Sequence, residues 1–208
     1  LSLARNNLAA TGNSSFGYFG GGDPGPRSTV DRIDYSNDTA TASSKGPLSL
    51  ARNRGAASSA RANGFAATDT TLPPSNSPNQ YIPFGYFGGG GNPGSVSTVD
   101  RIDYSNDTAT ASSKGPLSAA RYNLAATGNK YYGYFGGGSI VSTVDRIDYL
   151  NDTVTASPKG PLSLARYNLA ATGNSSFGYF GGGRSPATVS TVDRIDYSND
   201  TATAPTKG

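Results

Sequence analysis

Apolar and polar positions alternate in short segments along the chain, and the same segments return four times. An aromatic run that ends in three glycines recurs as Phe16–Gly22, Phe84–Gly90, Tyr132–Gly138 and Phe177–Gly183. The segment Thr-Val-Asp-Arg-Ile-Asp-Tyr follows each run, at 29–35, 98–104, 143–149 and 191–197. Alternating β-branched and aromatic residues, interrupted every few positions by Gly, Asn, Asp and Ser, predict short strands rather than helices.

We expect four strands in each repeat, shown here on the last one. They are predicted at 167–172, 177–180, 191–197 and 201–204, in the order of the chain. Turns are expected at Gly173–Ser176 and Ser198–Asp200, because Gly and Asn tolerate a positive φ and Asp and Ser favour turns. A Lys-Gly-Pro-Leu-Ser linker then leads into the next repeat, where Pro suits a linker because it donates no ladder hydrogen bond.

The repeats occupy residues 1–47, 48–116, 117–161 and 162–208, and we interpret them as a single repeat domain. A period of about 45 residues is in the range of propeller blades. The fold prediction is therefore all-β: a β-propeller with four antiparallel blades in this chain. The second repeat carries an inserted loop at about 54–80, expected before its second strand. Two interpretations of this loop remain: a surface loop that carries function, and an insertion that the fold tolerates without a function.

One repeat resembles the kelch repeat, and the resemblance extends to all four. It has a pre-strand Arg, a small-residue strand, an Asn-Gly-like turn, an apolar strand that ends in Gly-Gly and an aromatic on the third strand. In the last repeat these residues are Ala165-Arg166, Ala170-Ala171, Gly173-Asn174, Tyr179–Gly182, Val192 and Ile195–Tyr197. The resemblance implies a propeller of four-stranded blades. The family's fourth-strand Trp is missing, and Ala109 or Ala202 stands near its place.

The exact amino-acid sequence of the repeats also resembles repeat tracts in predicted structural proteins of marine phages, cyanophages especially. This second resemblance implies a virion or tail component, or a protein that contacts the host. An extracellular or virion-associated location follows as an expectation.

Three sets of repeated residues are predicted to be structural. The glycines let the chain leave a strand where another backbone passes closely. The arginines precede the first strand, and the aspartates end the third. The sets are Gly21, Gly89, Gly137 and Gly182; Arg5, Arg52, Arg121 and Arg166; and Asp34, Asp103, Asp148 and Asp196.

The Asp-Arg-Ile-Asp segment also admits a catalytic interpretation. Alternation places Val30, Arg32 and Asp34 on one strand face, with Asp31, Ile33 and Tyr35 on the other. Two carboxylates, such as Asp31 and Asp34, could serve as the acid and base of a glycoside hydrolase. The set is copied four times, however, whereas an enzyme needs one asymmetric site. Arg–Asp pairing between strands or blades is the preferred interpretation.

Composition removes several kinds of chemistry. Cys, His, Met and Trp are absent, and all 14 acidic residues are Asp. This excludes disulfides, thiol nucleophiles, ordinary zinc or haem sites and a Ser-His-Asp triad. A net charge of +3 is too small and too evenly spread to indicate nucleic acid. No apolar run is long enough for a membrane span. We therefore expect no catalytic residues, no cofactor and no metal, and the start at Leu1 suggests a piece of a longer or processed protein.

The turns after the third strand offer two further interpretations. Asp34–Asp38 supplies oxygen ligands suited to calcium, but it lacks the spacing of known calcium loops, so an Asx turn is preferred. Asn-Asp-Thr also matches the N-glycosylation sequon, at Asn37, Asn106, Asn151 and Asn199. Good turn chemistry is again the preferred explanation.

We expect the chain to be a non-catalytic interaction or structural module whose partners are proteins or glycans. The alternative is a decoration or fibre segment that assembles with copies of itself, and the third hypothesis is the hydrolase. Tyr18, Tyr86, Tyr134 and Tyr179 are expected to line the core, whereas Tyr131 and Tyr81 could stack on a partner.

Ring closure can also be predicted, because the last repeat ends where the first begins. We expect the four blades to close, with the first and last in contact. If they stay open, the terminal blades should expose apolar residues such as Ile33 or Phe180.

Overall fold

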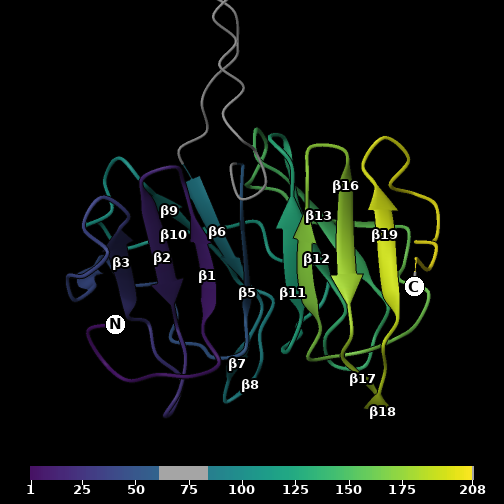
Figure 1. The fold of residues 1–208 in the computed structure, drawn as a ribbon, viewed down its shortest axis with the longest axis horizontal. Helices are drawn as coiled ribbons and strands as arrows, with labels where there is room; N and C mark the ends of the chain where they lie inside the picture. Colours follow the sequence, from purple (N-terminus) through teal and green to yellow (C-terminus); the bar gives the residue numbers. More distant parts are fainter. Residues whose placement is uncertain (61–83, 208) are drawn as a thin grey trace, which may run out of the picture.

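The computed structural model describes residues 1–60 and 84–207, and its strands form four successive antiparallel sheets arranged as propeller blades (Figure 1). No helix occurs in the described residues, so none of them forms a helix that could span a membrane. The all-β prediction and the four-bladed propeller arrangement are therefore confirmed.

Each blade takes its strands from one stretch of the chain. The first contains β1 (Ala9–Gly12), β2 (Phe16–Gly20), β3 (Val30–Asp34) and β4 (Ser43–Lys45). The second contains β5 (Ala56–Ser59), β6 (Phe84–Gly88), β9 (Val99–Asp103) and β10 (Ser112–Lys114). The third contains β11 (Ala125–Gly128), β12 (Tyr132–Gly136), β13 (Val144–Asp148) and β14 (Ser157–Lys159).

The fourth blade contains β15 (Ala170–Gly173), β16 (Phe177–Gly181) and β19 (Val192–Asp196). Thr206 bridges Asp193 at the place where the other blades have a fourth strand. Short hairpins form in two of the variable loops: β7 (Gly91–Asn92) with β8 (Gly94–Ser95), and β17 (Arg184–Ser185) with β18 (Ala187–Thr188).

The outermost strand lies later in the repeat than the sequence predicted. Residues 201–204 form a turn and coil, and their counterparts in the first blade, 39–42, do so as well. The turn is longer than expected because the amide of Asn37 donates to Asp34 O and that of Ala40 donates to Asn37 O. The fourth strand therefore falls on the residues assigned to the linker, such as Ser43–Lys45.

The predicted loop of the second repeat also needs a correction. β5 covers Ala56–Ser59 and pairs with β6, so these residues form the first strand of the blade rather than part of a loop. Ala56 and Ser58 are buried. Residues 61–80 of the predicted insertion, and Tyr81, lie outside the described residues.

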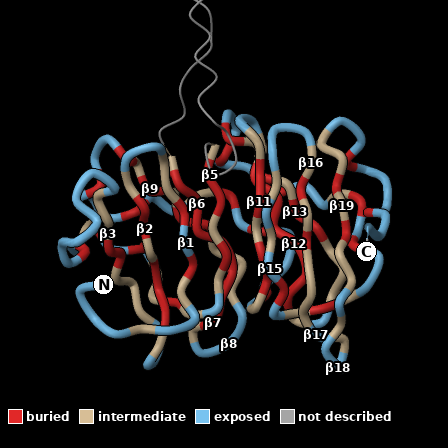
Figure 2. The backbone as a smooth tube through the Cα atoms, in the orientation of Figure 1, coloured by how far each residue is buried: buried red, intermediate tan, exposed pale blue. Residues whose placement is uncertain are grey.

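The hydrophobic core lies between blades rather than within one. One cluster joins Tyr18 and Val30 of the first blade to Phe87, Ile102 and Tyr104 of the second. Equivalent clusters join the second blade to the third and the third to the fourth. Figure 2 shows the buried residues within the strands and the exposed ones mostly in the loops at their ends.

The first strands of the blades are innermost, as their small residues predict. β1 contacts β5, β5 contacts β11 and β11 contacts β15, but no comparable contact joins the described strands β15 and β1. Figure 1 shows the two termini at opposite sides of the molecule. The expected contact between the first and last blades is therefore wrong for this structure. The terminal blade does not expose Phe180 either, because that ring is buried against Gly136 of the third blade.

Candidate interaction surfaces

Each junction between neighbouring blades is built around a pair of stacked tyrosines. Tyr18 of β2 and Tyr104, which follows β9, have ring centroids 4.8 Å apart and planes inclined by 21°. The Tyr104 hydroxyl lies 3.0 Å from Thr11 Oγ1 on the innermost strand of the preceding blade. The other junctions repeat the stack with Tyr86–Tyr149 and Tyr134–Tyr197. Offset stacking is a favourable geometry for buried rings.

At each junction, one aspartate of the following blade binds polar side chains of the preceding blade. Asp107 accepts hydrogen bonds from the Tyr18 hydroxyl at 2.9 Å and from Arg32 Nη1 at 2.7 Å. Lys45 Nζ lies 3.5 Å from its other oxygen. Asp152 and Asp200 hold the equivalent groups at the next two junctions. A buried carboxylate is tolerated where several donors compensate its lost hydration.

Burial and the aspartate together shift the ionisation of these groups. Burial raises the pKa of Tyr18, Tyr86 and Tyr134, and the nearby carboxylate raises it further. Burial lowers the pKa of Arg32, but the hydrogen bond and charge of Asp107 outweigh it, so the pKa is raised. The junction therefore favours neutral tyrosine beside a charged Arg–Asp pair.

Glycines allow the blades to approach this closely. A Cβ atom at Gly20 would lie 2.7 Å from the Phe87 ring, and one at Gly46 would lie 1.8 Å from Ala109 O. The amide of Gly46 donates to Asp107 O at 2.8 Å. Gly115 and Gly160 make the same contacts with the third and fourth blades.

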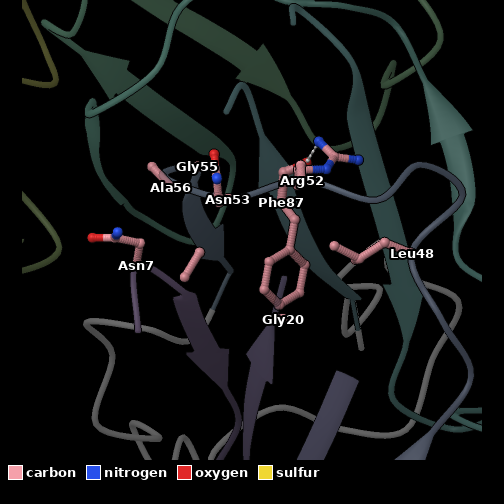
Figure 3. A pocket seen from close by; sticks show the side chains of 9 residues that line it. Asn7, Gly20, Leu48, Arg52, Asn53, Gly55, Ala56 and Phe87 are labelled. Atoms are coloured by element: carbon pink, nitrogen blue, oxygen red, sulfur yellow. Dashed lines mark hydrogen bonds between the residues drawn. The ribbon is translucent and has the colours of Figure 1, made fainter. Parts of the chain in front are cut away.

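The first junction leaves only a narrow interstice. Figure 3 shows its lining, with the Phe87 ring directed at Gly20 and with Leu48 and Arg52 beside it. The interstice is too narrow to admit a water molecule. It is therefore a packing defect of the junction rather than a ligand pocket.

The four predicted arginines lie inside their own blades. Arg5, Arg121 and Arg166 bind Asp31, Asp145 and Asp193 at 2.6, 2.6 and 3.0 Å, and Arg52 binds Asp100 in the same way. Arg121 also donates to backbone oxygens, including Thr143 O at 2.8 Å. Burial lowers the pKa of Arg52 and Arg121, although the carboxylates oppose this shift. These arginines fasten the segment before the first strand to the sheet.

The predicted aspartates at the ends of the third strands form Asx turns. Asp34 Oδ1 accepts hydrogen bonds from the Ser36 amide at 2.9 Å and the Ser36 hydroxyl at 2.7 Å. These hydrogen bonds lower the pKa of Asp34, and the equivalent bonds lower that of Asp196. Asp103 and Asp148 accept the equivalent amide hydrogen bonds. These residues therefore form the Asx turns that were the preferred interpretation of the sequence.

The two carboxylates of the hydrolase hypothesis have separate structural partners. Asp31 is buried and bound by Arg5 and by the Ser2 amide and hydroxyl. Asp34 stays in its own turn with Ser36. Within the described residues, no group of three or more acidic side chains gathers as a metal site would require.

The predicted glycines adopt left-handed conformations, with φ between 64° and 74° at Gly21, Gly89, Gly137 and Gly182. A Cβ atom at Gly21 would lie 2.5 Å from Arg52 O of the second blade. At Gly182 the nearest such atom is 3.8 Å away, because no described blade packs against this side of the fourth blade. The close backbone approach expected from the sequence is thus present at the junctions.

The fourth blade presents one half of a junction without the other half. Tyr179, Arg194 and Lys207 occupy the positions of Tyr18, Arg32 and Lys45, and we call them the basic end face. No carboxylate lies within salt-bridge distance of Arg194 or Lys207 in the described part of the chain. Tyr179 is partly exposed, whereas Tyr18, Tyr86 and Tyr134 are fully buried.

The first blade presents the complementary half. Phe19, Tyr35 and Asp38 occupy the positions of Phe87, Tyr104 and Asp107, and we call them the acidic end face. Tyr35 is 54% exposed, compared with 9% for Tyr104 and 3% for Tyr149. Asp38 is exposed and forms no salt bridge with another described residue.

Sequence reasoning missed the role of Asp107, Asp152 and Asp200. The Asn-Asp-Thr segment was assigned to turn chemistry. That assignment explains why the segment lies in a turn, but not why its aspartate is buried in the last three repeats. A usable signal was present: every repeat carries an Arg and a Lys at fixed positions, such as Arg32 and Lys45, in addition to the pair formed by Arg5 and Asp31. These cations needed a further buried acid.

Comparison with known proteins adds no family. No protein-family model matches the chain, and no curated protein matches it.

Proposed function

We propose that this chain is a non-catalytic interaction or structural module of a virion, tail or extracellular assembly, and that its partners are proteins or glycans. The kelch-like character of the repeats and their likeness to phage repeat tracts belong to this proposal. Its main support is the pair of end faces, since each presents aromatic and charged groups that have counterparts buried at three internal junctions.

The engagement of the acidic residues supports the non-catalytic part. Asp31 is bound by Arg5, Asp34 by Ser36 and Asp107 by Arg32 and Tyr18. A general acid or base must reach the substrate, whereas Asp31 and Asp107 are almost fully covered by their partners.

A polar hollow on the second blade supports glycan binding as a second possibility for the partner. It encloses about 150 Å³ and is lined by Arg101, Asp103, Asn106, Thr110 and Ser112, with Ala109. These side chains supply donors and acceptors of the kind that hydrogen-bond sugar hydroxyls.

The test is a glycan array combined with affinity capture from a defined set of cell-envelope and virion proteins. We expect saturable binding without turnover of any glycan. Asn106→Ala should reduce binding if the hollow is the glycan site, and Asn37→Ala, at the same position of the first blade, is the matched control. Glycan hydrolysis that disappears on a single Asp31→Asn substitution would contradict the proposal.

A further inference from the structure

Both end faces carry unused halves of one repeated interface. At each internal junction, the basic side of one blade meets the acidic side of the next, with the tyrosine stack, the Arg–Asp bond and the Lys–Asp contact reproduced three times. The Arg–Asp distances are 2.7, 2.8 and 2.7 Å. The geometry is therefore a property of the repeat and does not depend on one particular pair of blades.

The basic end face is already arranged for docking. Arg194 stacks on Phe177 with its guanidinium carbon 4.5 Å from the ring centroid. Arg32, Arg101 and Arg146 make the same stack while they bind an aspartate of the next blade, at 4.2, 4.0 and 4.3 Å. Arg194 thus keeps its docked orientation without a bound carboxylate, which reduces the ordering cost of association.

The acidic end face offers what the basic one requires. Asp38 supplies the carboxylate, Tyr35 the second ring of the stack and Phe19 the ring that enters the space beside a glycine. That space is open at Gly181, where a Cβ atom would meet only Val192 of the same blade, at 3.7 Å. At Gly20, Gly88 and Gly136 the same position is filled by the phenylalanine of the following blade.

We infer that the basic end face of one copy binds the acidic end face of a second copy, in the geometry of the internal junctions. This inference rests on the proposed function and names the partner of its end faces. Charge complementarity between Arg194 or Lys207 and Asp38 favours this occupant, and so does continuity with the existing junctions. The contact is heterologous, so copies join head to tail and form a ring or a filament according to the rotation between blades.

The test uses sedimentation velocity of the full chain over a wide concentration range. Wild type should form head-to-tail oligomers, and raised salt should weaken them because the Asp38 contact is electrostatic. Asp38→Arg and Arg194→Asp should each weaken self-association roughly 100-fold or more, since like charges then face each other. A 1:1 mixture of the two variants should recover association, because one intact end face of each kind remains.

A steric variant tests the same contact without a change of charge. Gly181→Leu should block association while the melting temperature stays unchanged, because its side chain enters open space in a single copy. Gly94→Leu is the matched control, since a Cβ atom there meets nothing within 4 Å and lies away from both end faces.

Three outcomes overturn the inference. One is a monomer at every concentration, and another is association that Gly181→Leu leaves intact. The third is a monomeric native polypeptide in which Tyr35 is buried by its own chain. A monomer that still captures a glycan or another protein removes only the inference. A chain that binds nothing, itself included, removes the proposed function as well.

Discussion

Arg32 reaches across the first junction and donates a hydrogen bond to Asp107, with 2.7 Å between Nη1 and Oδ2. Asp107 is the fourth residue after β9, and the same oxygen accepts a hydrogen bond from the Tyr18 hydroxyl. One carboxylate therefore holds two side chains of the preceding blade. The first repeat has the same residue, Asp38, but no other described blade packs against it, and it is exposed.

Asp107→Ala should destabilise the protein by about 3 kcal/mol, because it leaves Arg32, Tyr18 and Lys45 without their acceptor. Asp38→Ala is the matched control, and we expect its effect to stay within about 0.5 kcal/mol. Denaturant unfolding of both variants measures the difference. Equal losses of stability would show that the turn, rather than the junction, accounts for the role of Asp107.

Much of this architecture could be predicted from the sequence because it is repeated. Residues such as Phe16, Tyr18 and Val30 follow strand alternation, so the second and third strands were placed to within a residue or two. The fourth strand was misplaced because Thr39 and Ala40 resemble a strand start, whereas hydrogen bonds within the turn hold them elsewhere. Contacts between blades, such as Tyr18 with Asp107, are invisible to a pattern within one repeat.

Ring closure could not be predicted for a different reason. The end of the last repeat and the start of the first match only in their position within the repeat sequence. Closure of the ring depends instead on the rotation from one blade to the next. That rotation is set by contacts such as Gly46 against Ala109 and Phe87 against Gly20. The sequence names these residues but not the angle at which they pack.

Gly115→Ala should be strongly destabilising, by roughly 3 kcal/mol or more. The added Cβ would lie 1.8 Å from Val154 O, a backbone atom that cannot move without separating the second and third blades. Gly94→Ala is the control and should have little effect, because the space around it is open. Thermal unfolding followed by circular dichroism compares them, and a normal melting temperature for Gly115→Ala would contradict the close approach.

Arg121→Met should cost about 3–5 kcal/mol, because Asp145 then remains buried without its partner. Arg121 is 2% exposed and Asp145 is fully buried. Arg184→Met, on an exposed hairpin, controls for the loss of one positive charge. Denaturant titration gives both values. Adding Asp145→Asn to Arg121→Met should recover part of the loss, and no recovery would place the effect in the backbone bonds of Arg121 instead.

Stability should fall at high pH because the junction tyrosines must stay neutral. Burial raises the pKa of Tyr104 and Tyr149, and it raises that of Tyr197 to about 12. In the unfolded chain these groups lose their protons near pH 10, while the folded protein still holds them. Unfolding then releases protons, so the free energy of unfolding decreases as pH rises.

The stabilisation is fully present below about pH 9, and each buried tyrosine removes up to about 1.4 kcal/mol per pH unit between pH 10 and its folded pKa. Denaturant unfolding from pH 7 to 11, followed together with tyrosinate absorbance, checks this. Tyr104→Phe keeps the ring stack but removes one ionisable group, so its stability should fall less steeply above pH 10. A parallel slope for the variant and wild type would mean that Tyr104 ionises equally in both states, contrary to its buried position against Tyr18.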